Sequence, residues 1–458
     1  MNSNSLIVTM TLGEAPDSVP ALLDVRSGHA RAVQGLDGGA LDRIVTRFAG
    51  AARIARVHGA RASWHLRGQR HVRFDALEQT CGVARTFLIE VMPGTAVRDL
   101  VRELAQLSKV ASVTPNYMCV SPCDLGAPVQ PDAAWAPHLM VRAPEALAHE
   151  PGDNAVLLGL VDSGIVTDHP ELAGRLRAGL DTVHLSDDGV SPGITLLGEH
   201  QNFDSNPRDQ YVGHGMGCAG IMSGLGLQLA PGLAGEAQII PMRALAAARL
   251  PGRANPVGLG AIADLDAAVK LAVDLGAKII NMSFGTDDAA LSPESPKPHA
   301  DVVRYALEHG CILIAASGNN GQWTRYWPAA HPSVIAVGAV GENRAPATFS
   351  TRGDHVSICA PGERILSAGL TGYQHVTGTS FAAPFVAGAC ALLVARGARR
   401  AMPVDAECAI ELLTRSCQPF AGKDHSGCGA GILDAAAALV ALDAMIDRMR
   451  SEEDTEDG

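Results

Sequence analysis

The sequence is poor in aromatic residues, in positive charge and in long apolar runs. Aromatic residues make up 4% of the 458 residues while glycine occurs 49 times, so we expect elements whose backbones pack closely together. The net charge of −12 leaves no basic stripe for phosphates and argues against a nucleic-acid-binding protein. No uncharged apolar run reaches the roughly 18 residues of a membrane-spanning helix, so we expect no membrane span.

Targeting signals and close cysteine pairs are missing as well. Residues 1–20 lack a basic region and a long apolar core, which favours a cytoplasmic location, with secretion by another route as the alternative. The ten cysteines include no CxxC pair, so no zinc site is predicted. Cys417 with Cys428, and Cys119 with Cys123, are candidates for small disulfide loops, and free buried thiols are the alternative.

The sequence before residue 135 divides into three segments. Residues 1–80 are weakly periodic and have no predicted role. Residues 81–118 predict a strand, a helix and a second strand, in "RTFLIEVM", "GTAVRDLVRELAQLSKV" and "ASVTPNY". Residues 119–134 are rich in proline and predict an extended linker.

Residues 135–445 alternate apolar runs with helical patterns. The runs are "AVLLGLVD", "AQIIPMR", "KIINMSF", "CILIAA", "SVIAVGAV" and "HVSICA". Apolar strands separated by helices predict an α/β fold with a doubly wound, mostly parallel sheet flanked by helices, whose functional groups gather at the carboxyl ends of the strands. Residues 446–458 include the acidic "SEEDTEDG" and are predicted to be disordered.

Four polar residues stand out in this larger region. Asp162 ends an apolar run, His214 lies between two glycines, Asn319 follows "CILIAA", and Ser380 precedes a helix of small residues. Each has a structural explanation when it is taken alone. Asp162 and Ser380 are suitable helix caps, a lone histidine is most often structural, and Gly-Asn-Asn-Gly is an ordinary turn.

The order and surroundings of these residues favour a single site. The segments "VDSGIVTDHPEL", "GHGMGCAG", "INMSFG", "AASGNNG", "SVIAVGAV" and "GTSFAAPFVAGA" resemble the motifs of the subtilisin-like serine peptidases, or subtilases, over about residues 135–440. The resemblance implies a serine endopeptidase that acts through an acyl-enzyme intermediate. Asp162, His214 and Ser380 would form its catalytic triad, in the chain order of the subtilisins, and Asn319 would donate to the oxyanion.

The same resemblance implies substrate and propeptide contacts. An extended peptide or protein substrate would bind by strand addition along two segments that flank the primary side-chain pocket: Ser283, Phe284 and Gly285, and Ala316, Ser317 and Gly318. Both segments are also ordinary strand ends. Residues 81–118 resemble the end of a subtilase propeptide, a small α+β domain that would inhibit the enzyme until cleavage within residues 119–134. A permanent accessory domain is the alternative.

No cofactor or metal ion is predicted. Glu171 matches a carboxylate that helps to bind calcium in subtilisins, but the loop "GLGLQLAPGLAG" offers few side-chain oxygens, whereas calcium takes about six to eight oxygen ligands. Cys218, four residues after His214, resembles the proteinase K branch of the family. It predicts a thiol beside the triad and inhibition by mercurials, with an inert buried cysteine as the alternative.

Two alternatives to a peptidase have weaker support in the sequence. A nucleotide-binding enzyme has only "GLGAIA" at residues 258–263 in its favour, and this stretch follows a loop instead of a strand. A subtilase without catalysis is disfavoured by the complete set of four polar residues. Within the peptidase reading, both a general protease and one that processes a particular substrate remain open.

Overall fold

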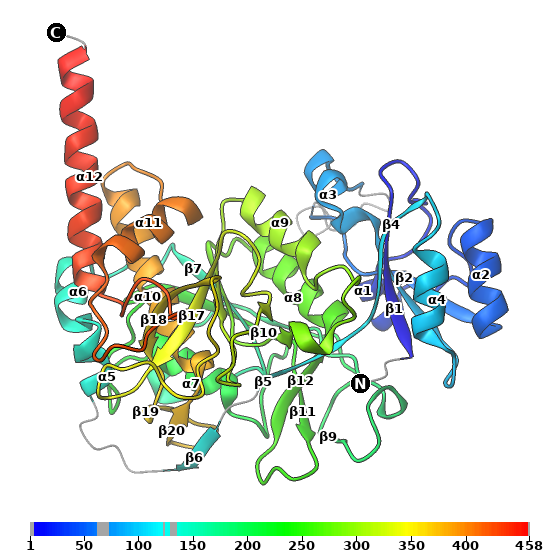
Figure 1. Cartoon of the computed structure of the whole chain (residues 1–458), viewed down its shortest axis with the longest axis horizontal. Coiled ribbons are helices and arrows are strands. Elements are labelled where there is room, and N and C mark those ends of the chain that lie inside the picture. The colour runs from blue at the N-terminus through cyan, green and yellow to red at the C-terminus, as the bar shows by residue number, and fades with distance from the viewer. Residues whose placement is uncertain (1–3, 62–72, 122–123, 129–134, 457–458) are drawn as a thin grey trace.

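The computed structural model describes residues 4–61, 73–121, 124–128 and 135–456. An N-terminal α+β domain (residues 4–115) packs beside a larger α/β domain, and the helix α12 (Ala435–Glu456) lies at the opposite end of the molecule (Figure 1). The larger domain confirms the predicted fold class.

The N-terminal domain is built on one antiparallel sheet. Its strands are β1 (Ser5–Met10), β2 (Ala52–Arg56), β3 (Thr86–Val91) and β4 (Val110–Pro115), in the order β2-β3-β1-β4. Helices α2 (Ala40–Ala49) and α4 (Val97–Leu104) bury their apolar residues against one face of the sheet. Two strand–helix–strand units of this kind make a ferredoxin-like sheet.

This sheet corrects the boundary expected at residue 80. β1 and β2 come from the first 80 residues, yet they pair with β3 from the segment beyond. Residues 1–80 and 81–118 therefore do not form separate domains. Local periodicity could not reveal this, because the partners of β1 lie about a hundred residues further along the chain.

The larger domain contains a seven-stranded parallel sheet in the order β18-β17-β15-β13-β7-β10-β8. All six predicted apolar runs form strands of this sheet. Its members are β7 (Leu157–Asp162), β8 (Leu180–Asp181), β10 (Gln238–Arg243), β13 (Ile279–Met282), β15 (Ile312–Ala316), β17 (Val334–Val340) and β18 (Val356–Pro361).

Helices cover both faces of the sheet, because alternate strand residues point to opposite sides. In β15, Ile312 and Ile314 belong to one core and Leu313 and Ala315 to the other. The first core includes α7 (His214–Ser223), α10 (Thr379–Arg399) and α11 (Ala406–Ser416), and the second includes α8 (Ile262–Asp274) and α9 (Ala300–Glu308). By length and composition α10 could span a bilayer, but most of it is buried in the core, which accounts for its apolar character.

The N-terminal domain packs its second sheet face on α8 and α9. Ile7 and Leu88 of the sheet belong to the same apolar cluster as the buried residues of these two helices. Buried ion pairs cross the contact: Lys270 Nζ lies 2.8 Å from Glu78 Oε1, and Arg26 Nη2 lies 2.9 Å from Asp264 Oδ1. Helices α1 (Leu22–Arg26) and α3 (Ala76–Cys81) supply the N-terminal partners.

The segment expected to be a linker contains two strands. β5 (Met118–Ser121) pairs with β12 (Val257–Ala261), and β6 (Asp124–Pro128) pairs with β20 (Tyr373–Thr377). The remaining residues of the expected linker that could hold a cleavage point, 122–123 and 129–134, lie outside the described residues. Two short sheets extend these pairs with β9 (Thr195–Leu197) and β11 (Ala246–Arg249), and with β19 (Ile365–Ala368).

β12 also settles the nucleotide-binding alternative. The loop predicted before this stretch is present between Arg249 and Val257, and residues 258–261 belong to β12, with α8 directly after it. Its glycines pair with β5 instead of forming a turn: a Cβ at Gly260 would lie 2.5 Å from the carbonyl oxygen of Ala244. They serve close strand packing, which leaves no phosphate-binding turn in this stretch.

The disorder predicted for residues 446–458 is corrected by α12, which continues to Glu456 (Figure 1). Ion pairs fix the helix to the domain: Asp443 accepts from Arg396 and His149 at 2.8 Å, and Asp447 pairs with Arg400. A nucleated helix extends at little cost, so a run of acidic residues does not end it. The nine cysteines among the described residues are free thiols, so the Cys417–Cys428 bridge is not formed.

Candidate active site

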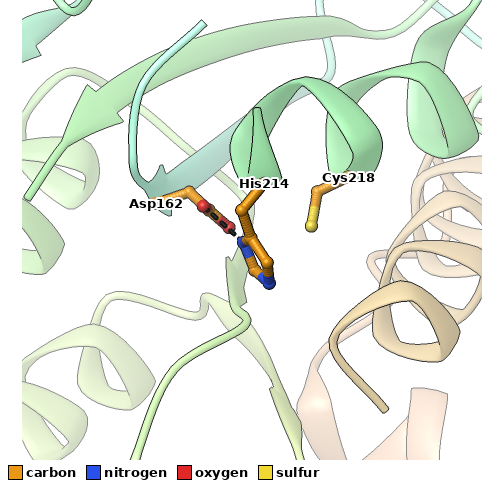
Figure 2. Close-up of side chains that lie close together, drawn as sticks. All are labelled: Asp162, His214 and Cys218. Carbon is orange, nitrogen blue, oxygen red and sulfur yellow. Dashed lines mark hydrogen bonds and ion pairs between the residues drawn. The ribbon is translucent and has the colours of Figure 1, made fainter. Parts of the chain in front are cut away.

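The carboxyl edge of the parallel sheet brings Asp162 and His214 together. Asp162 is the last residue of β7, and His214 is the first residue of α7. Both are fully buried, and His214 Nδ1 lies 2.6 Å from Asp162 Oδ1 (Figure 2). The same carboxylate oxygen accepts the backbone N–H of Ser163 at 2.7 Å. These two bonds fix the position of the carboxylate and the orientation of the ring.

Small residues allow α7 to begin this close to β7. A Cβ at Gly215 would lie 2.2 Å from the carbonyl oxygen of Gly164, in the turn that follows Asp162. Gly213 before the helix has φ 77°, a backbone conformation that favours glycine. The glycines on both sides of His214 therefore have a structural reason, which is the close approach of helix and turn.

Asp209 organises the approach to His214, and the sequence analysis missed it. Its carboxylate accepts the hydroxyl of Ser163 at 2.7 Å and the backbone N–H groups of Tyr211, Val212 and Gly213 at 2.8–3.0 Å. Burial raises the pKa of Asp209, and these four hydrogen bonds oppose the rise. Its place five residues before a glycine-flanked histidine was the available signal.

Ser380 lies in the first turn of α10, where backbone N–H groups have no helical acceptor. Pro384, four residues later, has no N–H to donate to the Ser380 carbonyl. That carbonyl accepts instead from Ser283 Oγ at 2.8 Å and from Cys218 Sγ at 3.4 Å, and Ser380 Oγ donates to the carbonyl of Ser283 at 3.3 Å. The proline thus frees a carbonyl by which neighbouring elements fix the serine.

The amide of Asn319 is held by its oxygen. Oδ1 accepts the backbone N–H of Thr379 at 2.8 Å and the Thr379 hydroxyl at 2.9 Å. Because the amide is planar, its NH₂ end points away from Thr379. Asn319 follows β15 and Thr379 precedes Ser380, so these hydrogen bonds bring the Asn319 amide to the start of α10.

Gly217 and Phe381 pack against each other. Gly217 lies in the first turn of α7, and Phe381 follows Ser380 at the start of α10. A Cβ at Gly217 would lie 2.8 Å from Cε1 of Phe381, so the glycine makes room for the ring. The centroid of that ring lies 5.0 Å from the centroid of His214. The absence of a side chain at Gly217 thus makes the phenylalanine possible beside His214.

The two predicted substrate segments lie on either side of Ser380. Ser283 contacts it directly, and Gly318 N donates to Thr379 Oγ1 at 3.3 Å. The side chains of Phe284 and Ala316 are buried, and Ser317 Oγ donates to Thr351 O at 3.2 Å, so these residues can offer a peptide only their backbone.

Strand β5 lies along the first of these segments. Its residues pair with β12 on one side, and Val120 forms an antiparallel bridge with Gly285 on the other. Cys119 Sγ lies 3.1 Å from Thr286 Oγ1. An extended segment of the chain thus occupies the space between β12 and the 283–286 segment.

Two groups of residues offer candidate metal ligands. Asp162, His214 and Cys218 each offer a ligand atom within 4.8 Å of the others (Figure 2), but Asp162 and Cys218 already bond to His214 and to the Ser380 carbonyl. Glu171 accepts four backbone N–H groups, those of residues 226–229, at 2.7–3.2 Å. A loop that presents N–H groups to a carboxylate offers no oxygen ligands there, so this position does not fit calcium.

Comparison with known proteins agrees with this geometry. Residues 153–417 match the model of the subtilase family. The chain belongs to the subtilase family. It is 35% identical to a thermophilic serine proteinase of Bacillus sp. (strain AK1) over 54% of this chain and 54% of that protein, and 32% identical to thermitase of Thermoactinomyces vulgaris over 56% and 81%. It thus spans about half the length of the first of these relatives.

A solved protease structure matches as well. The prenylagaramide maturation protease PagA superposes with a TM-score of 0.53 and 27% identity, over 66% of this chain and 98% of that one. The first relative is named as a serine proteinase and the solved structure as a maturation protease. The family match does not include the N-terminal domain.

Proposed function

We propose that the chain hydrolyses peptide bonds through Asp162, His214 and Ser380. The observation that carries the proposal is the 2.6 Å contact between Asp162 and His214 beside the anchored Ser380. A serine hydroxyl is a weak nucleophile and needs a base to take its proton. His214 is the residue for this role, since Asp162 holds its Nδ1 and stabilises the imidazolium that forms.

The remaining steps follow the same groups. Ser380 Oγ attacks the carbonyl carbon of the substrate. The oxyanion that forms accepts hydrogen bonds from the Asn319 NH₂ group and the Ser380 backbone N–H. His214 then donates its proton to the leaving amine as the C–N bond breaks, which leaves an acyl-enzyme. Water hydrolyses the ester by the same route, and the serine is restored.

We also propose that the chain is made as an autoinhibited precursor. The support is β5, which fills the space beside Ser283–Gly285 where an extended substrate would add as a strand. The N-terminal domain leads directly into β5, so its contact with α8 and α9 would hold β5 in place. The domain is then the chain's own inhibitory partner until cleavage after β5.

The test uses the full chain with Ser380, with Ser380→Ala and with the control Ser205→Ala, whose serine is exposed. The wild type and the control should react with a fluorophosphonate probe and yield a product whose N-terminus lies beyond Ser121. Ser380→Ala should remain unlabelled and full-length. If the folded wild type stays unlabelled after its N-terminal domain has been removed by another protease, the triad is not functional.

No bound calcium is proposed at Glu171. The Glu171 carboxylate orders residues 226–229 by accepting four hydrogen bonds from their backbone N–H groups. Tyr373 Oη donates a fifth hydrogen bond to Glu171 at 3.3 Å. Removing calcium with a chelator should leave the melting temperature unchanged. A fall that calcium restores would contradict this.

A further inference from the structure

The place for the side chain next to the scissile bond is set by two glycine-containing segments. Ser380 Oγ lies 3.3 Å from the carbonyl oxygen of Ser283, and Gly318 is bonded to Thr379. If Ser380 attacks the substrate, which is the proposed function on which this inference rests, the residue that supplies the attacked carbonyl must direct its side chain between these two segments.

The ring of Tyr326 already occupies this place. A Cβ built on Gly285 would lie 2.5 Å from Cδ1 of Tyr326 and 2.7 Å from its Cε1. A Cβ built on Gly318 would lie 2.9 Å from Cδ2 and 3.1 Å from Cγ of the same ring. Cδ1 and Cδ2 are on opposite edges, so one edge of the ring faces each glycine. The ring therefore bridges the gap between the two segments.

The surrounding structure fixes this ring. Tyr326 begins the short strand β16 (Tyr326–Trp327), which pairs with β14 (Thr286–Asp287) directly after Gly285. Trp327 is buried and donates from Nε1 to Asp288 Oδ1 at 2.7 Å. Burial raises the pKa of Tyr326, and the carboxylate of Asp287 raises it further. The tyrosine is therefore part of the wall of the site and does not lie on a free loop.

We propose that Tyr326 determines the specificity of the peptidase by filling the pocket for the primary side chain. The enzyme would then cleave after small residues, namely glycine, alanine and serine. A leucine or phenylalanine side chain at the same substrate position would have to displace the ring from between Gly285 and Gly318.

The experiment compares peptides that differ only in the residue before the scissile bond. With the chain as expressed, after any autoprocessing, kcat/KM for alanine should exceed that for phenylalanine by about tenfold or more, because a filled pocket excludes the larger side chain. Tyr326→Gly should reverse this order. The matched control Tyr326→Phe keeps the ring, and it should keep the preference for alanine.

The outcomes separate this inference from the proposed function. Fluorophosphonate labelling of Ser380 does not depend on the substrate side chain. A labelled wild type that cleaves after phenylalanine as fast as after alanine overturns the role of Tyr326 alone, whereas loss of labelling overturns the triad and this inference with it. If Tyr326→Gly fails to fold, the ratio of kcat/KM for alanine and phenylalanine in the wild type tests the inference. Tyr326→Ala then serves as the variant with the opened pocket.

Discussion

The active site and the contact with the N-terminal domain both include buried apolar packing, but they differ in the residues that complete it. Around Ser380 and His214, glycine and alanine let helices and turns approach at backbone distance. Across the domain contact, long charged side chains meet: Lys270 with Glu78, and Arg26 with Asp264.

The difference concerns what happens on separation. Helix α7 cannot leave the turn at Gly164 without exposing apolar core. The close backbone contacts would be lost, and water would not replace them with contacts of equal strength. Charges of an ion pair regain hydration when they part, and their desolvation cost is returned. The first arrangement suits a permanent site, and the second suits a contact that is made during folding and later broken.

The largest effect is expected from the active-site side of this comparison. Asn319→Ala should lower kcat by about 10²–10³-fold with little change in KM, the size of effect established for an oxyanion donor in a subtilisin. The control Asn320→Ala removes the neighbouring amide, which bonds to Asp287 and Thr351 and not to Thr379. If kcat of Asn319→Ala falls by less than fivefold in steady-state kinetics, Asn319 does not donate to the oxyanion.

The next effect tests the charged contact. In a Ser380→Ala background, Lys270→Ala leaves Glu78 and Asp274 buried without their cation, and should cost about 3–5 kcal/mol in the free energy of unfolding. The exposed pair of Arg102 and Asp99 provides the control: Arg102→Ala should cost less than about 1 kcal/mol. Urea titration measures both.

The stability cost of Lys270→Ala can also be compared between the uncleaved and the cleaved protein. Once the N-terminal domain has gone, Lys270 has lost Glu78 in the wild type too, and the penalty of Lys270→Ala should shrink. An equal penalty in the cleaved and uncleaved proteins would show that the pair with Asp274 alone accounts for it, and that the charged contact does not distinguish the two states.

A smaller effect is expected at Glu171, which is buried but uses backbone partners. Glu171→Gln replaces a charged acceptor of four N–H groups by an amide whose NH₂ faces some of them. The free energy of unfolding should fall by about 1–3 kcal/mol, with no rescue by calcium. Glu342→Gln, at an exposed glutamate, is the control and should change nothing measurable. Rescue by calcium would show that the carboxylate binds an ion.

The active site was more predictable from sequence than the N-terminal domain, for the same physical reason. Backbone-close packing around Asp162, His214 and Ser380 leaves contiguous motifs of glycine and small residues that can be recognised in a few residues of sequence. The ion pairs of the domain contact join single residues from segments about 190 to 240 residues apart, such as Glu78 with Lys270, and no local pattern records such pairs.

The errors have the same origin. β1 pairs with strands far along the chain, β5 and β6 pair with β12 and β20, and none of these pairings follows from periodicity. Asp209 and Tyr326 were missed because their importance lies in what they touch. Tyr326 is an ordinary aromatic residue in the sequence, and only its place between Gly285 and Gly318 gives it a role.

The smallest effect is expected at Cys218, whose thiol is buried beside His214 and the carbonyl of Ser380. Its thiol is a weak donor to the Ser380 carbonyl, and Ser283 Oγ remains as the stronger one at 2.8 Å. Cys218→Ala should therefore keep activity within about fivefold of the wild type.

The same variant should abolish inhibition by mercurials, because the sulfur of Cys218 lies within 4.8 Å of a ring nitrogen of His214 and a carboxylate oxygen of Asp162. The control is Cys390→Ala, which removes a fully buried thiol in α10 and should leave the inhibition intact. Inhibition that persists in Cys218→Ala and disappears in Cys390→Ala would place the sensitive thiol in the core of α10, away from the reacting groups.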